Sequence, residues 1–165
     1  MTDSPTRIAE RMQVEGKRTL EFFRELRPDQ WRAIMYTEGS VWTVREVLAH
    51  FVSAESGMTR LVENILAGGL GSPDDFDLNA YNERKVASFK EASTDELLGQ
   101  FAFLREKSAA LAANMNPENL TKTGRHPWLG KASIADILKM LYRHNQLHLR
   151  EIRRMINSSE PKQDG

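Results

Sequence analysis

Residues 133–156 read SIADILKMLYRHNQLHLREIRRMI, and this stretch decides the fold. Ser133 followed three residues later by Asp136 is a helix-start signal. Beyond it, apolar side chains recur every three or four residues, which is the spacing of one face of an α-helix. This stripe comprises Ile134, Ile137, Leu138, Leu141, Ile152, Met155 and Ile156. The segment therefore predicts a long amphipathic helix with one face buried against other helices.

Three other long segments carry the same periodicity. The first stops before Pro28, and the second and third each start at a capping box, in which Thr or Ser is followed three residues later by Glu. A shorter helical segment lies between the second and the third. The predicted helices cover about Pro5–Leu26, Val44–Ala67, Asn79–Glu91, Ser93–Met115 and residues 133–157.

No segment of the chain alternates apolar and polar residues over the length of a convincing strand. Strands fit only in Trp31–Trp42 and Thr121–Trp128, and both segments are too short to build a sheet. The amphipathic helices must therefore bury their apolar faces against one another. We expect an all-α fold, an up-and-down four-helix bundle with one short extra helix.

The composition fits one globular domain. We place it at residues 1–165, with an ordered core at about 5–157 and a polar tail at 158–165. Lys and Arg number 23 and so do Asp and Glu, so no net charge attracts nucleic acid or an acidic membrane, and we expect neither as a partner. The first ten residues contain no unbroken apolar run, which predicts a cytoplasmic protein. Because the chain has no cysteine, any metal ion is held by nitrogen and oxygen.

Histidines form the main chemical pattern. His144 and His148 are four residues apart on the last helix, so their rings project from one side, one turn apart, where they can bind one ion. His50 lies at the edge of the apolar stripe of the second long helix and can add a third ligand, which leaves a coordination position open. Buried histidines that only form hydrogen bonds fit the same spacing, and the spacing by itself does not decide between the two interpretations.

Other polar residues have two interpretations each. Glu55 falls in the apolar stripe of the second long helix, where it either accepts a proton or a hydrogen bond at the metal site or forms a buried pair with an arginine or tyrosine. His126 lies in a loop near one end of the bundle, where it either reaches the substrate or lies on the surface; we interpret it as a surface residue and not as a metal ligand. Four arginines cluster on the last helix opposite its apolar stripe, where they either contact phosphate or nucleic acid or form a solvated face, and we expect the solvated face; they are Arg143, Arg150, Arg153 and Arg154.

Three stretches resemble the DinB-like superfamily: VWTVREVLAH at 41–50, NAYNER at 79–84 and YRHNQLHLREI at 142–152. The loop HPWLG at 126–130 is similar to that of the branch that includes the N-terminal domain of mycothiol-dependent maleylpyruvate isomerase. The resemblance implies a four-helix bundle, commonly a homodimer, in which His50, His144 and His148 bind a divalent metal ion. One departure is Asn145, where the related motif commonly has aspartate; it affects what surrounds the ligands and not the ligands themselves.

The resemblance and the histidines together predict a metal-dependent enzyme with a small-molecule substrate. Nitrogen ligands suit zinc, nickel or iron. The expected reaction is either hydrolysis or a transfer or isomerisation that uses a low-molecular-weight thiol as cosubstrate. The alternative is a non-catalytic protein, a metal-binding or dimeric stress-response bundle.

Overall fold

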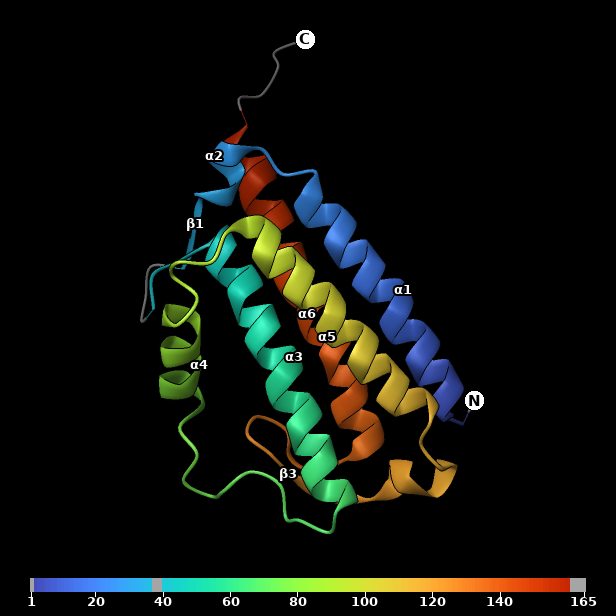
Figure 1. Cartoon of the computed structure of the whole chain (residues 1–165). Helices are drawn as coiled ribbons and strands as arrows, with labels where there is room; N and C mark the ends of the chain where they lie inside the picture. Colours follow the sequence, from blue (N-terminus) through green and yellow to red (C-terminus); the bar gives the residue numbers. More distant parts are fainter. Residues whose placement is uncertain (1, 37–39, 161–165) are drawn as a thin grey trace.

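A computed structural model of the chain describes residues 2–36 and 40–160. It is a bundle of four long helices (Figure 1), as the sequence predicts. These are α1 (Pro5–Arg24), α3 (Val44–Leu66), α5 (Thr94–Ala113) and α6 (Ile134–Ser159). Of the predicted polar tail, residues 158 and 159 belong to α6, and residues 161–165 lie outside the described part of the chain.

The connection between α3 and α5 sets the topology. It contains the short helix α4 (Leu78–Ala87) and leads the chain back along the bundle, so that α3 and α5 run in the same direction (Figure 1). The four-helix bundle is therefore as expected, but its long helices do not alternate strictly up and down, because α4 and its connections take the return path between α3 and α5. Helix α1 packs against α5 and α6, and α3 also packs against α5 and α6. Helices α3 and α6 are therefore neighbours across the bundle, although more than sixty residues separate them in the sequence.

Most helix starts follow the predicted capping signals. The backbone N–H of Glu96 donates to the hydroxyl of Ser93, and that of Asp136 donates to the hydroxyl of Ser133, both over 3.1 Å. The short helix α4 ends at Ala87, four residues earlier than predicted. Beyond it the chain turns, and the guanidinium of Arg45 donates to the backbone carbonyls of Phe89 and Ala92.

Strands occupy both segments that were judged too short for a sheet. Strand β1 (Ile34–Tyr36) pairs with β2 (Trp42–Thr43), and β3 (Thr123–His126) pairs with β4 (Gly130–Ser133), each pair antiparallel. The all-α class holds, but the expectation of no sheet is wrong for these two small hairpins. A strand of two to four residues needs only one partner close by in the sequence. Two short helical turns, α2 (Pro28–Trp31) and η1 (Pro117–Thr121), each begin at a proline and were not predicted.

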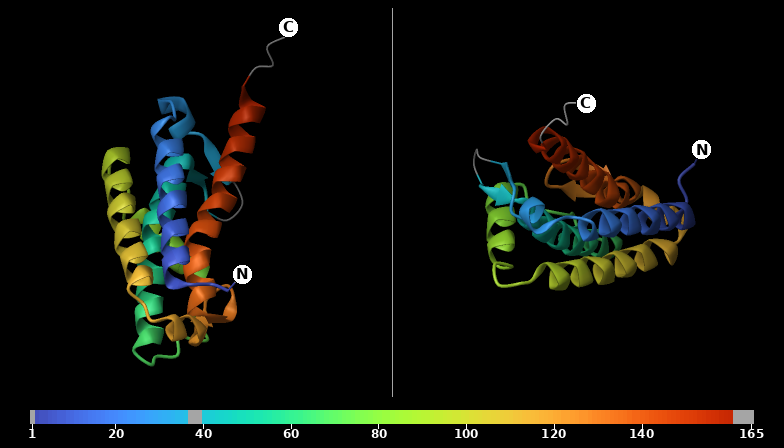
Figure 2. Two further views of the ribbon diagram at one scale, coloured as in Figure 1. Left: turned by 90° about the vertical axis from the view of Figure 1, so that its right-hand side faces the viewer. Right: turned by 90° about the horizontal axis from the view of Figure 1, so that it is seen from above.

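The core has two apolar halves with a polar layer between them. One half contains Met12, Val62 and Ile137, and the other contains Phe23, Phe51 and Phe101. Helix α6 is inclined away from the other long helices toward its C-terminal end, and β1 lies on that side (Figure 2). None of the helices in residues 2–36 and 40–160 combines the length and apolarity needed to cross a bilayer.

Candidate metal centre

The three histidines singled out in the sequence converge between α3 and α6. Nε2 of His144 lies 2.9 Å from Nε2 of His50 and 3.1 Å from Nε2 of His148. One ring nitrogen from each of the three histidines falls within 4.8 Å of the other two. The inclination of α6 and the four-residue spacing of its histidines thus bring two imidazoles from one helix to face a third from its neighbour.

Aromatic rings hold these imidazoles in place. The ring of Phe51 lies 5.8 Å from that of His144 and 5.7 Å from that of His148, and Trp42 lies 5.1 Å from His50, between ring centroids. Phe51 is fully buried in the core half that surrounds this end of the bundle. The ring orientations are therefore fixed by core packing, which limits the freedom that a ligand would have to remove.

A hydrogen-bond chain fixes the tautomer of His148. The hydroxyl of Tyr36 donates to the carboxylate of Glu151, and Nδ1 of His148 lies 2.8 Å from the oxygen of Tyr36. Because that hydroxyl proton is directed at the carboxylate, the Tyr36 oxygen accepts from His148, which assigns the ring proton to Nδ1. The lone pair of His148 is then on Nε2 and faces the other two imidazoles.

Burial keeps the three imidazoles neutral. It lowers the pKa of His50 to about 3, with a smaller effect from His148, and it lowers the pKa of His144 well below the usual value, helped by both neighbouring rings. The nearby side chain of Asn145 slightly opposes this lowering of the pKa of His144. The side-chain nitrogen of Asn145 nevertheless has no hydrogen-bond partner among the described residues. Burial also lowers the pKa of His148, although the charge of Glu151 opposes this.

Hydrogen bonds between the rings do not satisfy the cluster. A neutral imidazole nitrogen either donates one proton or accepts at one lone pair, so Nε2 of His144 makes a good hydrogen bond to only one of its two neighbours. In addition, Nδ1 of His50 and Nδ1 of His144 are buried with no hydrogen-bond partner among the described residues. Two nitrogens bound to one tetrahedral zinc ion lie roughly 3.3 Å apart, since each bond is about 2.0 to 2.1 Å. The donor set and its spacing therefore fit a divalent cation.

The cluster forms part of the wall of a cleft of about 1100 Å³. The cleft lies between α3 and α6 and is also lined by residues of the α3–α4 connection, of α4 and of the β3–β4 loop. Its apolar lining includes Met58, Leu61, Phe76, Trp128 and Met140. The imidazole cluster is thus reached from a space large enough for a small organic molecule.

His126 differs from its predicted place. It is buried and lines the cleft, because the loop between β3 and β4 folds back over its ring. Nδ1 of His126 accepts hydrogen bonds from the backbone N–H groups of Trp128 and Leu129, each over 3.1 Å. The ring proton is therefore on Nε2, and burial lowers the pKa of this imidazole. His126 is a neutral hydrogen-bond donor and not a surface residue.

The four arginines of α6 are all exposed, in agreement with the expected solvated face, but two of them also border the cleft. Arg143 and Arg150 line the cleft, although their side chains remain exposed. Arg153 lies over the ring of Phe22, and Arg154 is exposed outside the cleft. The apolar stripe of a single helix could not show which of its polar residues border a cleft made with other elements.

Glu55 is bound elsewhere. Its two carboxylate oxygens accept from Nε and Nη2 of Arg105 over 2.7 and 2.9 Å, and the hydroxyl of Ser108 donates to one of them over 2.6 Å. Arg105 also donates to the backbone carbonyls of Met12 and Leu141. This is the buried pair with an arginine, and it forms the polar layer between the two halves of the core. The structure shows no contact of Glu55 with any of the three histidines.

Tyr36 and Glu151 had not been singled out from the sequence. Glu151 follows His148 by three residues on the same helical face, which is a signal that could have been used. Tyr36 gave no such signal, because its position depends on the pairing of β1 with β2.

Solved structures share this fold. An uncharacterised protein from Escherichia coli UTI89 is 10% identical with a TM-score of 0.72, and 93% of each chain is covered. YfiT from Bacillus subtilis, described as "a probable metal-dependent hydrolase with an unusual four-helix bundle topology", is 20% identical with a TM-score of 0.67, over 92% of this chain and 85% of that one. The colibactin self-resistance protein ClbS, solved in complex with double-stranded DNA, is 11% identical with a TM-score of 0.64, over 91% and 94% of the two chains.

The sequence itself gives the family. No protein with curated annotation matches it. The family model of the DinB superfamily matches residues 11–152, a range that includes all three histidines of the cluster and all four long helices in whole or in large part. This chain belongs to the DinB superfamily.

Proposed function

We propose that the protein is a metal-dependent enzyme that binds one divalent cation through Nε2 of His50, His144 and His148 and acts on a small molecule in the adjoining cleft. The observation that carries the proposal is the convergence of three neutral imidazole nitrogens beside that cleft. Zinc, nickel and iron all suit such ligands. A cation with three protein ligands and an open position acts as a Lewis acid and lowers the pKa of the molecule that it binds.

The surrounding residues have distinct tasks in this proposal. Tyr36, itself held by Glu151, keeps the proton of His148 on Nδ1 and so keeps its Nε2 lone pair available. Phe51 packs against the rings of His144 and His148 from the core, and Trp42 packs against His50 from the cleft wall, so that both limit the movement of the imidazoles. His126 can donate a hydrogen bond from Nε2 to a molecule in the cleft.

Hydrolysis is the reaction that we put first. It needs only water and a substrate, and YfiT, which shares the fold, is described as "a probable metal-dependent hydrolase". The size of the cleft supports a second candidate, a transfer or isomerisation that uses a low-molecular-weight thiol. Its volume of about 1100 Å³ slightly exceeds the usual range for one drug-sized ligand, roughly 300 to 1,000 Å³, and accommodates a substrate together with a cosubstrate.

The first experiment measures metal content. The wild-type protein, freed of metal with a chelator and then dialysed with zinc, nickel or iron(II) in turn, should retain about one equivalent of at least one of them by elemental analysis. His148→Ala should abolish this retention while the helical circular dichroism is unchanged. His126→Ala is the matched control, since it removes a histidine of the same cleft that is outside the cluster, and it should leave the metal content intact.

Two results would contradict the proposal. One is a wild-type protein that retains none of the three metals. The other is a His148→Ala variant with unchanged metal content. If metal is bound but panels of esters, amides and phosphoesters, and electrophiles supplied with thiols, are all left unchanged, the site is a structural one and the non-catalytic alternative holds.

A further inference from the structure

The charge of the cleft wall differs from that of the whole protein. The chain has equal numbers of basic and acidic residues. Among the described residues that line the cleft, however, there are three arginines, Arg60, Arg143 and Arg150, and no Asp or Glu. None of these guanidinium groups forms an ion pair with a carboxylate in the described part of the chain. The formally charged side chains of the cleft lining are therefore all basic, in a protein whose basic and acidic residues are equal in number.

The arginines have a definite relation to the histidine cluster. Arg143 and Arg150 are seven residues apart, two turns of α6, and so lie on the same face of that helix. His144 and His148 lie between them in the sequence and line the same cleft. Arg60 comes from α3, and its guanidinium donates to the hydroxyl of Tyr81 over 3.3 Å. An anionic group bound by α6 would therefore be held close to the candidate metal centre.

The rest of the cleft is apolar. Besides the side chains already named, Leu78, Pro127 and Leu147 line it. Trp128 and Leu147 are 64% and 46% exposed, values that are high for large apolar side chains unless a partner covers them. The lining thus combines an apolar surface, cationic groups and the neutral donor His126, which is the combination that recognises an organic anion.

We propose that the substrate of this cleft is a small amphipathic anion, with an apolar body against the aromatic and aliphatic wall and a carboxylate-like or phosphate-like group at Arg143 and Arg150. The proposal rests on the proposed function for the use of the cleft, and it adds the class of molecule that the cleft selects. A small molecule that carries one charge and an apolar body fits a cleft of this size, whereas a duplex nucleic acid needs an extended basic surface.

The test uses three naphthalene compounds of nearly equal shape: 1-naphthaleneacetate, the neutral 1-naphthaleneacetamide and the cationic 1-naphthylmethylamine. Their dissociation constants are measured by titration calorimetry or ligand-observed NMR. We expect the anion to bind on the order of tenfold more tightly than the amide, since one exposed ion pair is worth about 1.4- to fivefold in affinity and two arginines contribute. The amine should bind most weakly.

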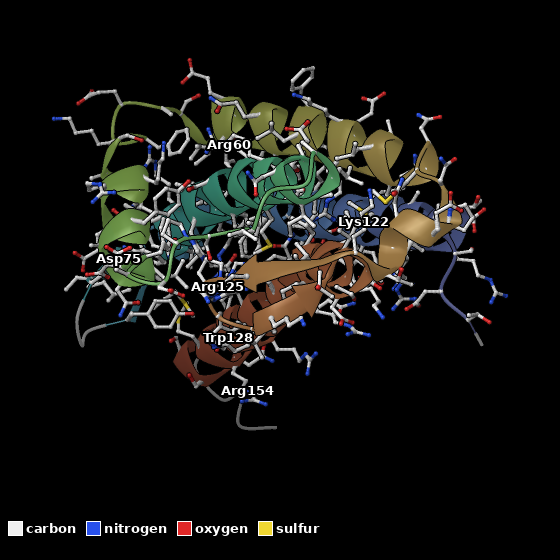
Figure 3. All side chains as sticks on the ribbon, turned by 90° about the horizontal axis from the view of Figure 1, so that it is seen from below. Arg60, Asp75, Lys122, Arg125, Trp128 and Arg154 are labelled. Atoms are coloured by element: carbon white, nitrogen blue, oxygen red, sulfur yellow. The ribbon has the colours of Figure 1, made fainter. Side chains whose placement is uncertain are left out.

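The variants assign the preference to its residues. The double variant Arg143→Gln, Arg150→Gln should bind the anion no more tightly than the amide, with the affinity for the amide unchanged. Arg154→Gln is the matched control, because Arg154 is an exposed arginine of the same helix outside the cleft, on the side of α6 away from Arg60 (Figure 3). It should behave as wild type.

Metal and arginine contributions are separable, because a bound cation also attracts an anion. The charge preference should persist in His148→Ala protein, which lacks the metal in our proposal. Loss of the preference in His148→Ala with retention in the arginine double variant would overturn the inference and leave the metal-dependent function standing. If the wild-type protein binds no metal but still prefers the anion, the metal-dependent function is wrong and the inference about the ligand stands.

A fluorescein-labelled 20-base-pair DNA duplex is titrated in parallel. If the duplex binds in a manner that depends on Arg143 and Arg150 while the three naphthalene compounds bind equally, the arginines serve nucleic acid and the inference is wrong. If neither the duplex nor the naphthaleneacetate distinguishes the double variant from wild type, the arginines do not select a ligand and the inference is also wrong.

Discussion

Replacement of Arg105 tests whether Glu55 has a structural role. Arg105 is 4% exposed and Glu55 is 1% exposed, and the two are joined by two hydrogen bonds. Arg105→Ala would leave a buried carboxylate with Ser108 as its remaining partner. It would also leave the carbonyls of Met12 and Leu141 without this donor. The single change therefore disturbs all four long helices at one level of the bundle.

The expected loss of stability follows from this geometry. Breaking a buried ion pair by removing one partner costs about 3 to 5 kcal/mol. The chain has 165 residues, and about 2.1 cal/mol/K per residue gives an unfolding entropy of about 0.35 kcal/mol/K. A loss of about 4 kcal/mol then lowers Tm by about 11 °C. The matched control Glu63→Gln, an exposed carboxylate on α3, should change the unfolding free energy by less than about 0.5 kcal/mol.

The assay combines urea denaturation, thermal denaturation and elemental analysis of metal. Glu55→Gln should also lower the unfolding free energy, yet leave the metal content and the affinity for a cleft ligand unchanged. The double variant Glu55→Leu, Arg105→Met should be less destabilised than Arg105→Ala, because it buries no charge. The reasoning is refuted if Arg105→Ala costs less than about 1 kcal/mol, or if Glu55→Gln alters metal content in a stably folded protein.

Three further predictions concern the metal centre and the chain around it. Tyr36→Phe should weaken metal binding by about 10- to 100-fold at constant helical content, because His148 loses the acceptor for its Nδ1 proton, and a dissociation constant within twofold of wild type would contradict this. The metal-free protein should lose stability as the pH falls below 6.5, because the unfolded chain then binds protons that the folded one, with a pKa of about 3 at His50, does not. At pH 5 that group alone should cost about 2 kcal/mol in urea denaturation, and His50→Gln should remove this part of the pH dependence. Gly71→Ala should lower Tm more than Gly68→Ala, since both residues have a φ of 91° but only at Gly71 would the new Cβ meet a backbone, that of β3; equal shifts would show that the contact is relieved.

Much of the fold could be predicted because helix periodicity and capping are local. Ser93 with Glu96, and Ser133 with Asp136, mark helix starts within a residue or two of the observed ones. The strands were missed because a pairing of two to four residues leaves little periodic signal. The end of α4 was misplaced because residues 88–92 form turns, with bonds such as that from the backbone N–H of Phe89 to the carbonyl of Val86, although no proline or glycine marks a break there.

The site was predictable in part for the same reason. The spacing of His144 and His148 is a local pattern, and the apolar stripe of the second long helix made His50 a candidate. The resemblance to a family was needed to favour binding of a metal ion by all three over plain hydrogen bonding. The positions of Tyr36 and of the cleft arginines depend on how distant segments pack together. The apolar stripe of a single helix carries no information on that packing. For Glu55, burial could be predicted from its position in the apolar stripe, but the choice of Arg105 as its partner could not.

The connection that makes α3 and α5 run in the same direction supplies part of the cleft wall but none of the candidate metal ligands. The three imidazoles are borne by two long helices whose positions are set by the core, whereas Phe76, Leu78, Asn79 and Tyr81 reach the cleft from the connection and from α4. Val86 is the one buried side chain of α4 among its described residues. Substitutions in this segment can consequently reshape the chamber at little cost to folding, so that new specificities can evolve on an unchanged reaction centre.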